Sequence, residues 1–271
     1  MKQPSDFWDA LAPFHAAIEN NYFDLPSLRH ILPELRDPVL VVGAGQGLIV
    51  EELLKRGFQC DGVDYSAEMI RQARQRRGLS LIQADAKAMP LKAGTYQTII
   101  YATGVADFIG DEAEIKLIMA EAARIVSRTG DIFVAFYQAS PAVEELLTAL
   151  GLLHNHVLFH REALEINRLN SLQMLAWVAE RAGVSYLRAV VLLLRMMLFS
   201  TLRDKRTAIE MKRIFRKMND VSLFIESAPE KMPYRNEGEI RNLFERLDMP
   251  IEQLWTLRSC LLARIRASGL Q

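Results

Sequence analysis

The residues of this chain whose types and spacing could do chemistry begin with a glycine-rich segment. Positions 43–47 read Gly-Ala-Gly-Gln-Gly and come directly after the β-branched apolar run 39–42. Glycine tolerates positive φ and has no side chain, so the backbone of such a turn can approach a ligand closely. The helix expected to follow would point its unpaired N–H groups at that ligand. The segment therefore predicts a ligand-binding turn.

Two aspartates continue this pattern farther along the chain. Asp64 lies seventeen residues after Gly47, at the end of a second short strand. A carboxylate there can accept hydrogen bonds from both hydroxyls of a ribose. Asp85 ends a third strand, where it can accept a hydrogen bond from an adenine amino group. The glycine spacing is GxGxG, whereas a dinucleotide pyrophosphate site has GxGxxG. Three such features at successive strand ends favour a ligand that contains a nucleoside.

The elements that must position these residues alternate from residue 38 to residue 138. Strands that are separated by single helices need crossover connections, which place the strands parallel in one sheet. This order predicts an α/β fold with a doubly wound, mostly parallel sheet that binds its ligand at the carboxyl ends of the strands. The predicted strands are 39–42, 60–64, 79–83, 98–102 and 131–137, and the predicted helices are 48–56, one capped by Ser66, and 112–126.

After residue 140, helical periodicity replaces this alternation for about ninety residues. The α/β pattern then returns with a helix at 236–247 and strands at 251–259 and 260–267. These two strands have almost no linker and suggest an antiparallel hairpin at the sheet edge, which gives a seven-stranded sheet with a helical insertion after its fifth strand. The predicted domains are an N-terminal helical lid 1–37, a ligand-binding α/β domain 38–139 with 233–271, and a helical cap 140–232.

The binding turn and the elements around it also carry a family pattern. The segments VLVVGAGQGLIVEELLKRGFQCDGVDYSAEMIRQAR, LIQADAKAMPL, TIIYATGVADFI and EAARIVSRTGDIFVAFY lie in this order within residues 38–138. With the closing segment NEGEIRNLFERLDMPIEQLWTLRSCLLARIR, the sequence resembles the class I S-adenosylmethionine-dependent methyltransferases of the small-molecule type. The resemblance implies a Rossmann-like methyltransferase fold, S-adenosylmethionine as methyl donor and S-adenosylhomocysteine as product.

The resemblance further implies which residues hold the cofactor. The glycine turn would pack against its methionyl part, Asp64 would hold the ribose, and Asp85 with Ala86 would read the adenine edge. Two side chains after the second strand would flank the adenine and ribose, and the residues after the fourth strand would line the reactive end. The complete implied set is Gly43, Ala44, Gly45, Asp64, Tyr65, Met69, Asp85, Ala86, Ala102, Thr103 and Gly104.

Two positions depart from the family pattern. The family usually has an acidic residue two positions before the first glycine, and this chain has Val41 there. Such a carboxylate helps to place the charged amino-acid end of the cofactor, so its absence bears on cofactor affinity or identity. The family also commonly has an aspartate just before the fourth strand, where this chain has Gln97, a change that we interpret as structural drift.

Residues that could act on a substrate are less clearly marked. Methyl transfer from a sulfonium is an in-line displacement at an activated carbon, so alignment and exclusion of water can supply much of the catalysis. A base is needed only when the nucleophile arrives protonated. The candidates are Asp107 in the loop after the fourth strand, Tyr101 on that strand, and His154 at the start of the insertion. The alternatives are a helix cap for Asp107, a core position for Tyr101, and ordinary packing for the histidine.

The start of the insertion contains a histidine cluster. His156 and His160 are four residues apart and would share one face of a helix, which is the geometry of two metal ligands, with Glu162 and Glu165 nearby. No HExxH pattern is present, and surface or packed histidines are the preferred interpretation, so no metal is predicted. The aromatic and methionine side chains of the insertion could line an apolar acceptor pocket or fill its helical core.

Composition excludes several classes of protein. The 271 residues are 50% apolar and carry 33 basic and 33 acidic side chains, which argues against a disordered chain and against a surface built to neutralise phosphates. Two distant cysteines cannot form a disulfide framework, and the N-terminal sequence lacks a secretory signal, so we expect a cytoplasmic protein. The apolar run 186–202 is interrupted by arginines, which favours a core or interface helix over a membrane span, and the apolar insertion could form a homodimer contact.

These observations favour methyl transfer to a small apolar or aromatic acceptor under the helical cap. A nicotinamide-dependent oxidoreductase also needs a strand, a glycine turn and a later acid. A non-catalytic relative could bind the nucleoside and act through its insertion. A nucleic-acid methyltransferase would use the basic segment 203–217, which has seven positive charges against two negative ones. A solvated helix face is the preferred interpretation of that segment.

Overall fold

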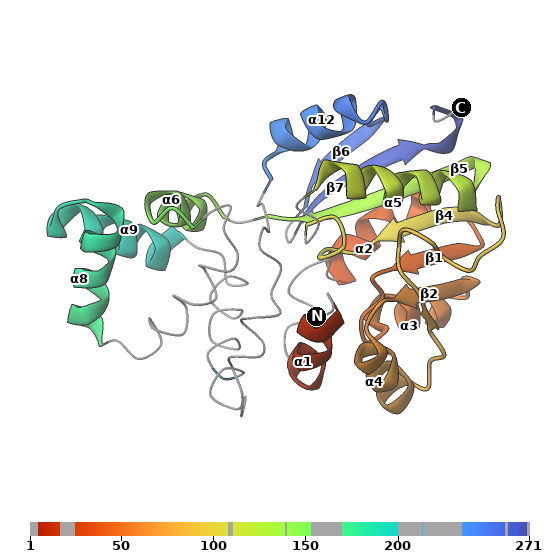
Figure 1. Ribbon diagram of the computed structural model, residues 1–271, viewed down its shortest axis with the longest axis horizontal. Helices are drawn as coiled ribbons and strands as arrows, with labels where there is room; N and C mark the ends of the chain where they lie inside the picture. Colours follow the sequence, from red (N-terminus) through yellow and green to blue (C-terminus); the bar gives the residue numbers. More distant parts are fainter. Residues whose placement is uncertain are drawn as a thin grey trace. The chain divides into compact units, whose positions relative to one another are not determined.

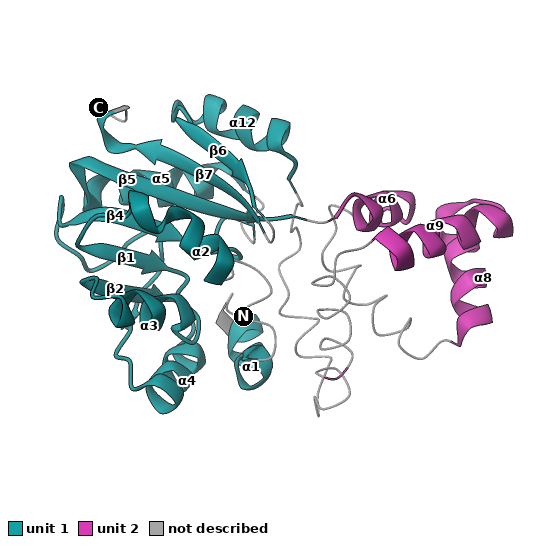
Figure 2. Ribbon diagram, turned by 180° about the vertical axis from the view of Figure 1, so that it is seen from behind, with its two compact units in different colours: residues 1–138, 235–271 teal, residues 139–234 magenta. Residues whose placement is uncertain are grey.

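The computed structural model describes two compact units. Unit 1 comprises residues 1–138 and 235–271, and unit 2 comprises residues 139–234 (Figure 2). Each unit is described by itself below. The residues that the structure describes are 5–16, 25–107, 111–138, 140–152, 170–199, 213, 235–257 and 260–269.

Seven strands within the described residues of unit 1 form one sheet (Figure 1). Its order is β3-β2-β1-β4-β5-β7-β6, in which the first five strands are parallel and β7 and β6 are antiparallel. The predicted doubly wound sheet with an antiparallel edge hairpin is therefore confirmed. The strands are β1 (Val39–Val42), β2 (Cys60–Asp64), β3 (Ile82–Gln83), β4 (Tyr96–Tyr101), β5 (Val126–Tyr137), β6 (Gln253–Thr256) and β7 (Cys260–Arg266).

Helices cover both faces of this sheet. Apolar residues of α5 and α12 pack on one face, and apolar residues of α2 and α3 pack on the other. Within unit 1 the described helices are α1 (Ser5–His15), α2 (Leu25–Ile31), α3 (Leu48–Lys55), α4 (Ala67–Arg77), α5 (Glu112–Ile125) and α12 (Glu237–Arg246), with the 3-10 helices η2 (Leu32–Glu34) and η3 (Ala267–Gly269).

Alternation along the strands explains how one sheet supports two cores. On β1, Leu40 and Val42 face the α5 and α12 side, whereas Val39 and Val41 face the α2 and α3 side. All four side chains are buried, as expected for a parallel strand that is covered on both faces. The continuous run 39–42 is therefore apolar because it has no solvent face. Val41 consequently points into a hydrophobic core.

Several predicted boundaries are wrong in extent. The third strand was expected at 79–83, but only Ile82 and Gln83 pair, because β3 is an edge strand that contacts β2 alone. The fifth strand begins at Val126, five residues earlier than expected, because that residue already pairs with Tyr96 before a register shift. The sixth strand is limited to Gln253–Thr256, the part that pairs with β7.

Unit 2 is helical in the residues that the structure describes. Its helices are α6 (Pro141–Ala149), α8 (Ser171–Ala182) and α9 (Tyr186–Phe199), and they share a small apolar core that includes Leu146, Val178 and Leu192. Trp177 and Met196 are partly buried against this core, in line with the prediction that the aromatic and sulfur side chains of the insertion fill a helical core. A function of unit 2 as a cap stays a prediction.

A buried carboxylate in the middle of β5 holds this strand to its neighbours. Asp131 is 1% exposed, and its two oxygens lie 2.7 Å from Nη2 of Arg36 and 3.1 Å from Nε of Arg264 on β7. Arg36 precedes β1 in the chain, so one carboxylate connects segments that are distant in sequence. Removing one member of a buried pair leaves the other charge uncompensated.

We expect Asp131→Ala to lower the free energy of unfolding by about 2–3 kcal/mol, below the full cost of an uncompensated buried charge because Arg36 is half exposed. Urea unfolding measures this change. Glu237→Ala is the matched control, since it breaks an exposed pair with Arg241 on α12 and should cost less than about 0.5 kcal/mol. Equal losses in the two variants would contradict the role assigned to Asp131.

Candidate cofactor site

The glycine turn after β1 adopts a backbone that other residues reach only with strain. Gly43, Gly45 and Gly47 have φ of 70°, 54° and 83°. A Cβ atom on Gly43 would lie 2.3 Å from Cγ2 of Val105, so a side chain does not fit there. The positive φ values and the close contact with Val105 explain why glycine occupies this turn.

Backbone hydrogen bonds tie this turn to the adjoining strand ends. The N–H of Ala44 donates to the carbonyl of Val63 on β2 over 2.9 Å, and the N–H of Ala102 donates to the carbonyl of Val42 over 3.0 Å. The ends of β1, β2 and β4 therefore meet around the turn. This is the edge of the sheet at which parallel α/β folds bind their ligands.

Asp64 is the central side chain at this edge. Its Oδ2 accepts from the N–H of Gly45 over 2.7 Å, and its Oδ1 accepts from the N–H of Ser66 over 2.9 Å. The residue is 9% exposed, and burial raises the pKa of its carboxyl to about 6 despite these donors. A carboxylate has about four lone-pair sites, so it keeps capacity for a further donor such as a ribose hydroxyl.

The helix after β2 begins with the predicted cap. The hydroxyl oxygen of Ser66 accepts from the N–H of Met69 over 3.0 Å, which confirms Ser66 as the N-cap of α4. The same hydroxyl donates to the carboxylate of Asp9 on α1, which also accepts from the N–H of Glu68 over 3.1 Å. Asp9 thus holds α1 to the first turn of α4.

α1 also contacts the other strand ends. The side-chain amide of Gln46 donates from Nε2 to the carbonyl of Ala12. A Cβ built on Gly45 would lie 3.3 Å from Cε1 of His15, and one built on Gly104 would lie 3.3 Å from the ring of Trp8. The helix therefore runs across the turns that follow β1, β2 and β4. A ligand in these turns would be shielded from water by α1.

Two buried polar atoms beside the glycine turn have no hydrogen-bond partner. They are Nδ1 of His15 and Oε1 of Gln46. Buried polar atoms are nearly always paired, so a pair of orphans at one place indicates a missing polar ligand group. The glycine turn, the carboxylate of Asp64 and these two atoms together fit a ligand that has a ribose and a charged amino-acid end.

The loop after β4 is closed by a buried carboxylate. Oδ2 of Asp107 accepts from the N–H of Gly104 over 3.1 Å and from the N–H of Tyr137 over 3.2 Å. Burial raises the pKa of Asp107 to about 7, although these donors and Arg235 favour its charged form. The hydroxyl of Tyr137 lies 3.2 Å from a Cβ built on Gly104, so an aromatic side chain stands at the loop.

Comparison with known proteins assigns the chemistry of this edge. Residues 39–130, which contain β1 to β4 and their turns, match the model of a methyltransferase domain. These residues are therefore a methyltransferase domain, in agreement with the resemblance to the class I S-adenosylmethionine-dependent methyltransferases. The match decides between the two cofactor classes that the glycine turn left open, in favour of S-adenosylmethionine over a nicotinamide.

The chain is 28% identical over 112 residues to a demethylmenaquinone methyltransferase of Corynebacterium urealyticum, an alignment that covers 41% of this chain and 46% of the relative. The chain thus spans about half the length of this curated relative. A chain in the complex between the Haloferax volcanii Trm112 methyltransferase activator and a methyltransferase has a TM-score of 0.54, 12% identity and 98% coverage of both chains. A Zn-dependent alcohol dehydrogenase of Rhodobacter sphaeroides has a TM-score of 0.58, 11% identity and 98% coverage of both chains. At such identities these two structures show the fold alone.

Other implied residues of the methyltransferase domain have varied environments. Met69 is buried, with 1% exposure, whereas Tyr65 is 37% exposed beside the end of β2. Asp85 accepts from the N–H of Lys87 over 2.9 Å, and its side chain is 42% exposed beside the ammonium of Lys87. Ala86 is partly buried against the sheet core. Asp85 and Tyr65 are accessible to a ligand, and contacts of all four residues with an adenine stay predictions.

Tyr101 has the environment of a core residue. It is fully buried among apolar side chains, and its hydroxyl donates to the carbonyl of Ile118 on α5 over 3.3 Å. Burial raises the pKa of this hydroxyl far above its usual range. This placement gives Tyr101 no access to a substrate, so the alternative interpretation of Tyr101 as a core residue fits the structure.

Several predicted features lie outside the described residues. His154, His156 and His160 are among them, together with Glu162 and Glu165. The basic segment 203–217 lies outside them as well, apart from Arg213, which is exposed. The predicted homodimer contact stays a prediction.

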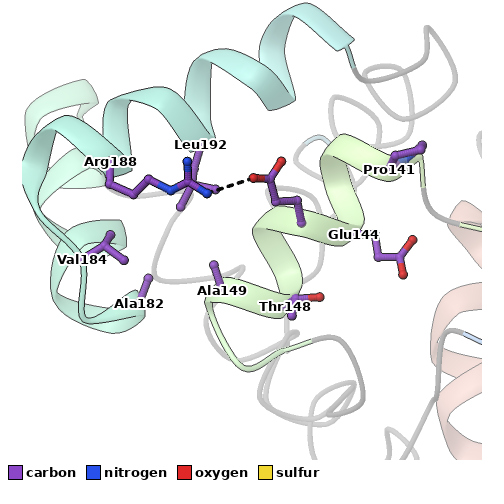
Figure 3. A pocket seen from close by; sticks show the side chains of 9 residues that line it. Pro141, Glu144, Thr148, Ala149, Ala182, Val184, Arg188 and Leu192 are labelled. Carbon is purple, nitrogen blue, oxygen red and sulfur yellow. Dashed lines mark hydrogen bonds and ion pairs between the residues drawn. The ribbon is translucent and has the colours of Figure 1, made fainter.

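Unit 2 has an open pocket of its own, with a volume of about 510 Å³ (Figure 3). It is lined by α6 and α9 and contains Glu145, whose carboxylate lies 3.2 Å from Arg188 and 3.1 Å from Arg195. One carboxylate therefore pairs with two arginine side chains of α9 within unit 2.

In the described part of the chain, histidine, cysteine and acidic side chains form no group that could hold a metal ion. Cys60 and Cys260 form no disulfide with each other, and burial raises the pKa of the Cys60 thiol to about 12. No single described helix is long and apolar enough to cross a membrane; α8 and α9 meet that criterion only together, with a bend of 109° between them.

Sequence reasoning missed most of the residues that α1 brings to the site. Trp8, Asp9 and His15 contact turns that lie between 30 and 96 positions away in the chain. One sequence signal was the predicted N-terminal helical lid 1–37, which did not specify the contacts of its side chains. Val41 was a second, indirect signal, because a missing carboxylate implies a replacement elsewhere.

The shifted pKa of Asp107 predicts a pH dependence of stability. A carboxyl whose pKa rises from 3.8 in the unfolded chain to about 7 in the folded one binds more protons when folded, so stability falls as pH rises from about 4 to about 7. Asp107→Asn keeps an oxygen that can accept from both backbone donors and removes this contribution. The slope for one bound proton is at most about 1.4 kcal/mol per pH unit.

Urea unfolding at pH 4.5, 5.5 and 7 measures this slope. We expect the free energy of unfolding to fall less steeply with rising pH in Asp107→Asn than in the unchanged protein. A smaller contribution of the same sign from Asp64 remains in both proteins. Parallel curves for the two proteins would show that Asp107 titrates normally.

Proposed function

We propose that this protein transfers the methyl group of S-adenosylmethionine to a small apolar or aromatic acceptor. The observation that carries the proposal is the carboxylate of Asp64, which lies at the end of β2 within hydrogen-bond distance of Gly45 in the glycine turn. Its remaining capacity to accept hydrogen bonds suits a ribose hydroxyl. The bound cofactor supplies a methyl carbon that is already activated by its sulfonium.

The residues of this chain then have to bind, orient and exclude water. α1 lies over the strand ends, where it keeps water from the reacting groups. Asp107 holds Gly104 and the end of β5 in one arrangement, which makes it a positioning residue for the loop at the reactive end. The side chain of Asp107 is fully buried, so its predicted role as a base for the acceptor stays a prediction.

Two observations support the acceptor class. The rings of Trp8 and Tyr137 stand at Gly104, and flat apolar or aromatic molecules pack well against such rings. The curated relative is a demethylmenaquinone methyltransferase, although the similarity covers 46% of it. Formation of S-adenosylhomocysteine with demethylmenaquinone and with simpler aromatic acceptors tests this class. Turnover on an oligonucleotide but on none of these molecules would overturn it.

We expect Asp64→Ala to weaken binding of S-adenosylmethionine and S-adenosylhomocysteine by roughly 100-fold or more, because charge-assisted hydrogen bonding to the ribose is lost. Calorimetric titration measures both affinities. Asp61→Ala is the matched control: this aspartate lies on the same strand, but its carboxylate accepts from the hydroxyl of Tyr96. Undiminished affinity in Asp64→Ala would contradict the assignment of Asp64 to the ribose.

A further inference from the structure

The position that usually supplies a carboxylate for the amino-acid end of the cofactor cannot do so in this chain. Val41 is fully buried, and its side chain packs in the core formed with α2 and α3. A cofactor that carries an ammonium group still needs hydrogen-bond acceptors near the glycine turn. The acceptors must therefore come from other residues.

The two orphan atoms beside the turn have the required chemistry. Gln46 is 1% exposed, and its Nε2 faces the carbonyl of Ala12, which can only accept a hydrogen bond. This neighbour fixes the orientation of the amide, so the unpaired atom of Gln46 is its oxygen, an acceptor. An ammonium group is a donor of three hydrogen bonds and would satisfy it.

The imidazole of His15 provides a second acceptor at the same turn. A Cβ built on Gly45 would lie 3.9 Å from Nδ1 of His15, and that nitrogen is buried without a partner. Burial, with a smaller effect of Arg77, lowers the pKa of the imidazole to about 4. The ring is therefore neutral at physiological pH, and in the tautomer that carries its proton on Nε2 the bare Nδ1 accepts a hydrogen bond.

The backbone around these atoms favours a cation as well. His15 is the last residue of α1, and the carbonyl of Ala12 belongs to the same final turn. The carbonyl end of a helix carries a partial negative charge, which attracts a positively charged group. The last turn of α1 thus brings Nδ1 of His15 beside Gly45 and the carbonyl of Ala12 to the side chain of Gln46.

We propose that His15 and Gln46 bind the ammonium group of the cofactor's amino-acid end and replace the acidic residue that is absent at Val41. This inference rests on the proposed binding of S-adenosylmethionine. It assigns to α1 a direct part in cofactor recognition, beyond covering the site.

The test compares three ligands by calorimetric titration. S-adenosylhomocysteine has the whole amino-acid end, S-adenosyl-3-thiopropylamine keeps the ammonium but lacks the carboxylate, and 5′-methylthioadenosine lacks both. His15→Phe keeps an aromatic ring without nitrogen. We expect it to weaken the first two ligands by roughly 10- to 100-fold, as for loss of a hydrogen bond to a charged group, and to change 5′-methylthioadenosine by less than about twofold.

Two further variants make the result specific. His15→Asn carries an oxygen near the place of Nδ1 and should restore most of the affinity for S-adenosylhomocysteine. His30→Phe alters an exposed histidine on α2 and should change none of the three affinities. Thermal unfolding of each variant checks that α1 and its surroundings remain folded.

Each contrary outcome has its own meaning. Equal weakening of all three ligands by His15→Phe would show that α1 acts only as a cover, and unchanged affinities would show that His15 is not a ligand; either result overturns the inference. Weakening of S-adenosylhomocysteine alone would assign His15 to the carboxylate and overturn it too. If the unchanged protein binds none of the three ligands, the proposed function itself fails. That outcome is distinguishable because it does not depend on the variants.

Discussion

The hydrogen bond from Gly45 to the carboxylate of Asp64 is the interaction on which the arrangement of the site depends. It joins the turn after β1 to the end of β2, and the other oxygen of the same carboxylate holds Ser66 at the start of α4. The carboxylate is therefore oriented before any ligand arrives. Such preorganisation reduces the ordering cost of binding. Burial raises the pKa of the Asp64 carboxyl, so holding the charged carboxylate at this place costs folding stability.

The parts of this arrangement that follow from local sequence were predictable. The parallel order of β1, β2 and β4 follows from alternation of apolar strands with helices, and the positions of Asp64 and Ser66 follow from where a strand ends and a helix begins. Strand lengths were less predictable, because β3 and β6 extend only as far as their neighbours pair with them. Which strands pair, and over what length, is determined by the assembled sheet. The periodicity of a single segment carries no information about its partners.

The contribution of α1 could not be predicted for a related reason. Its amphipathic pattern indicates a helix with one buried face, but nothing in the spacing of Trp8, Asp9 and His15 specifies which turns they meet. Those contacts span tens of residues and arise only when the sheet brings its strand ends together. The substitution at Val41 shows the complementary case, since a local departure from a pattern can be compensated by a residue from a distant helix.

The anchoring of α1 also bears on how long a bound cofactor would stay. α1 is fastened at three places: Asp9 holds the start of α4, Ala12 accepts from Gln46, and Trp8 packs at Gly104. A molecule beneath it can leave only after these contacts open, so its residence time is governed by the opening of a helix as well as by its own hydrogen bonds. We expect release of S-adenosylhomocysteine, rather than the displacement at carbon, to limit turnover in such an arrangement. Opening of α1, the proposed lid, would then determine the rate of turnover.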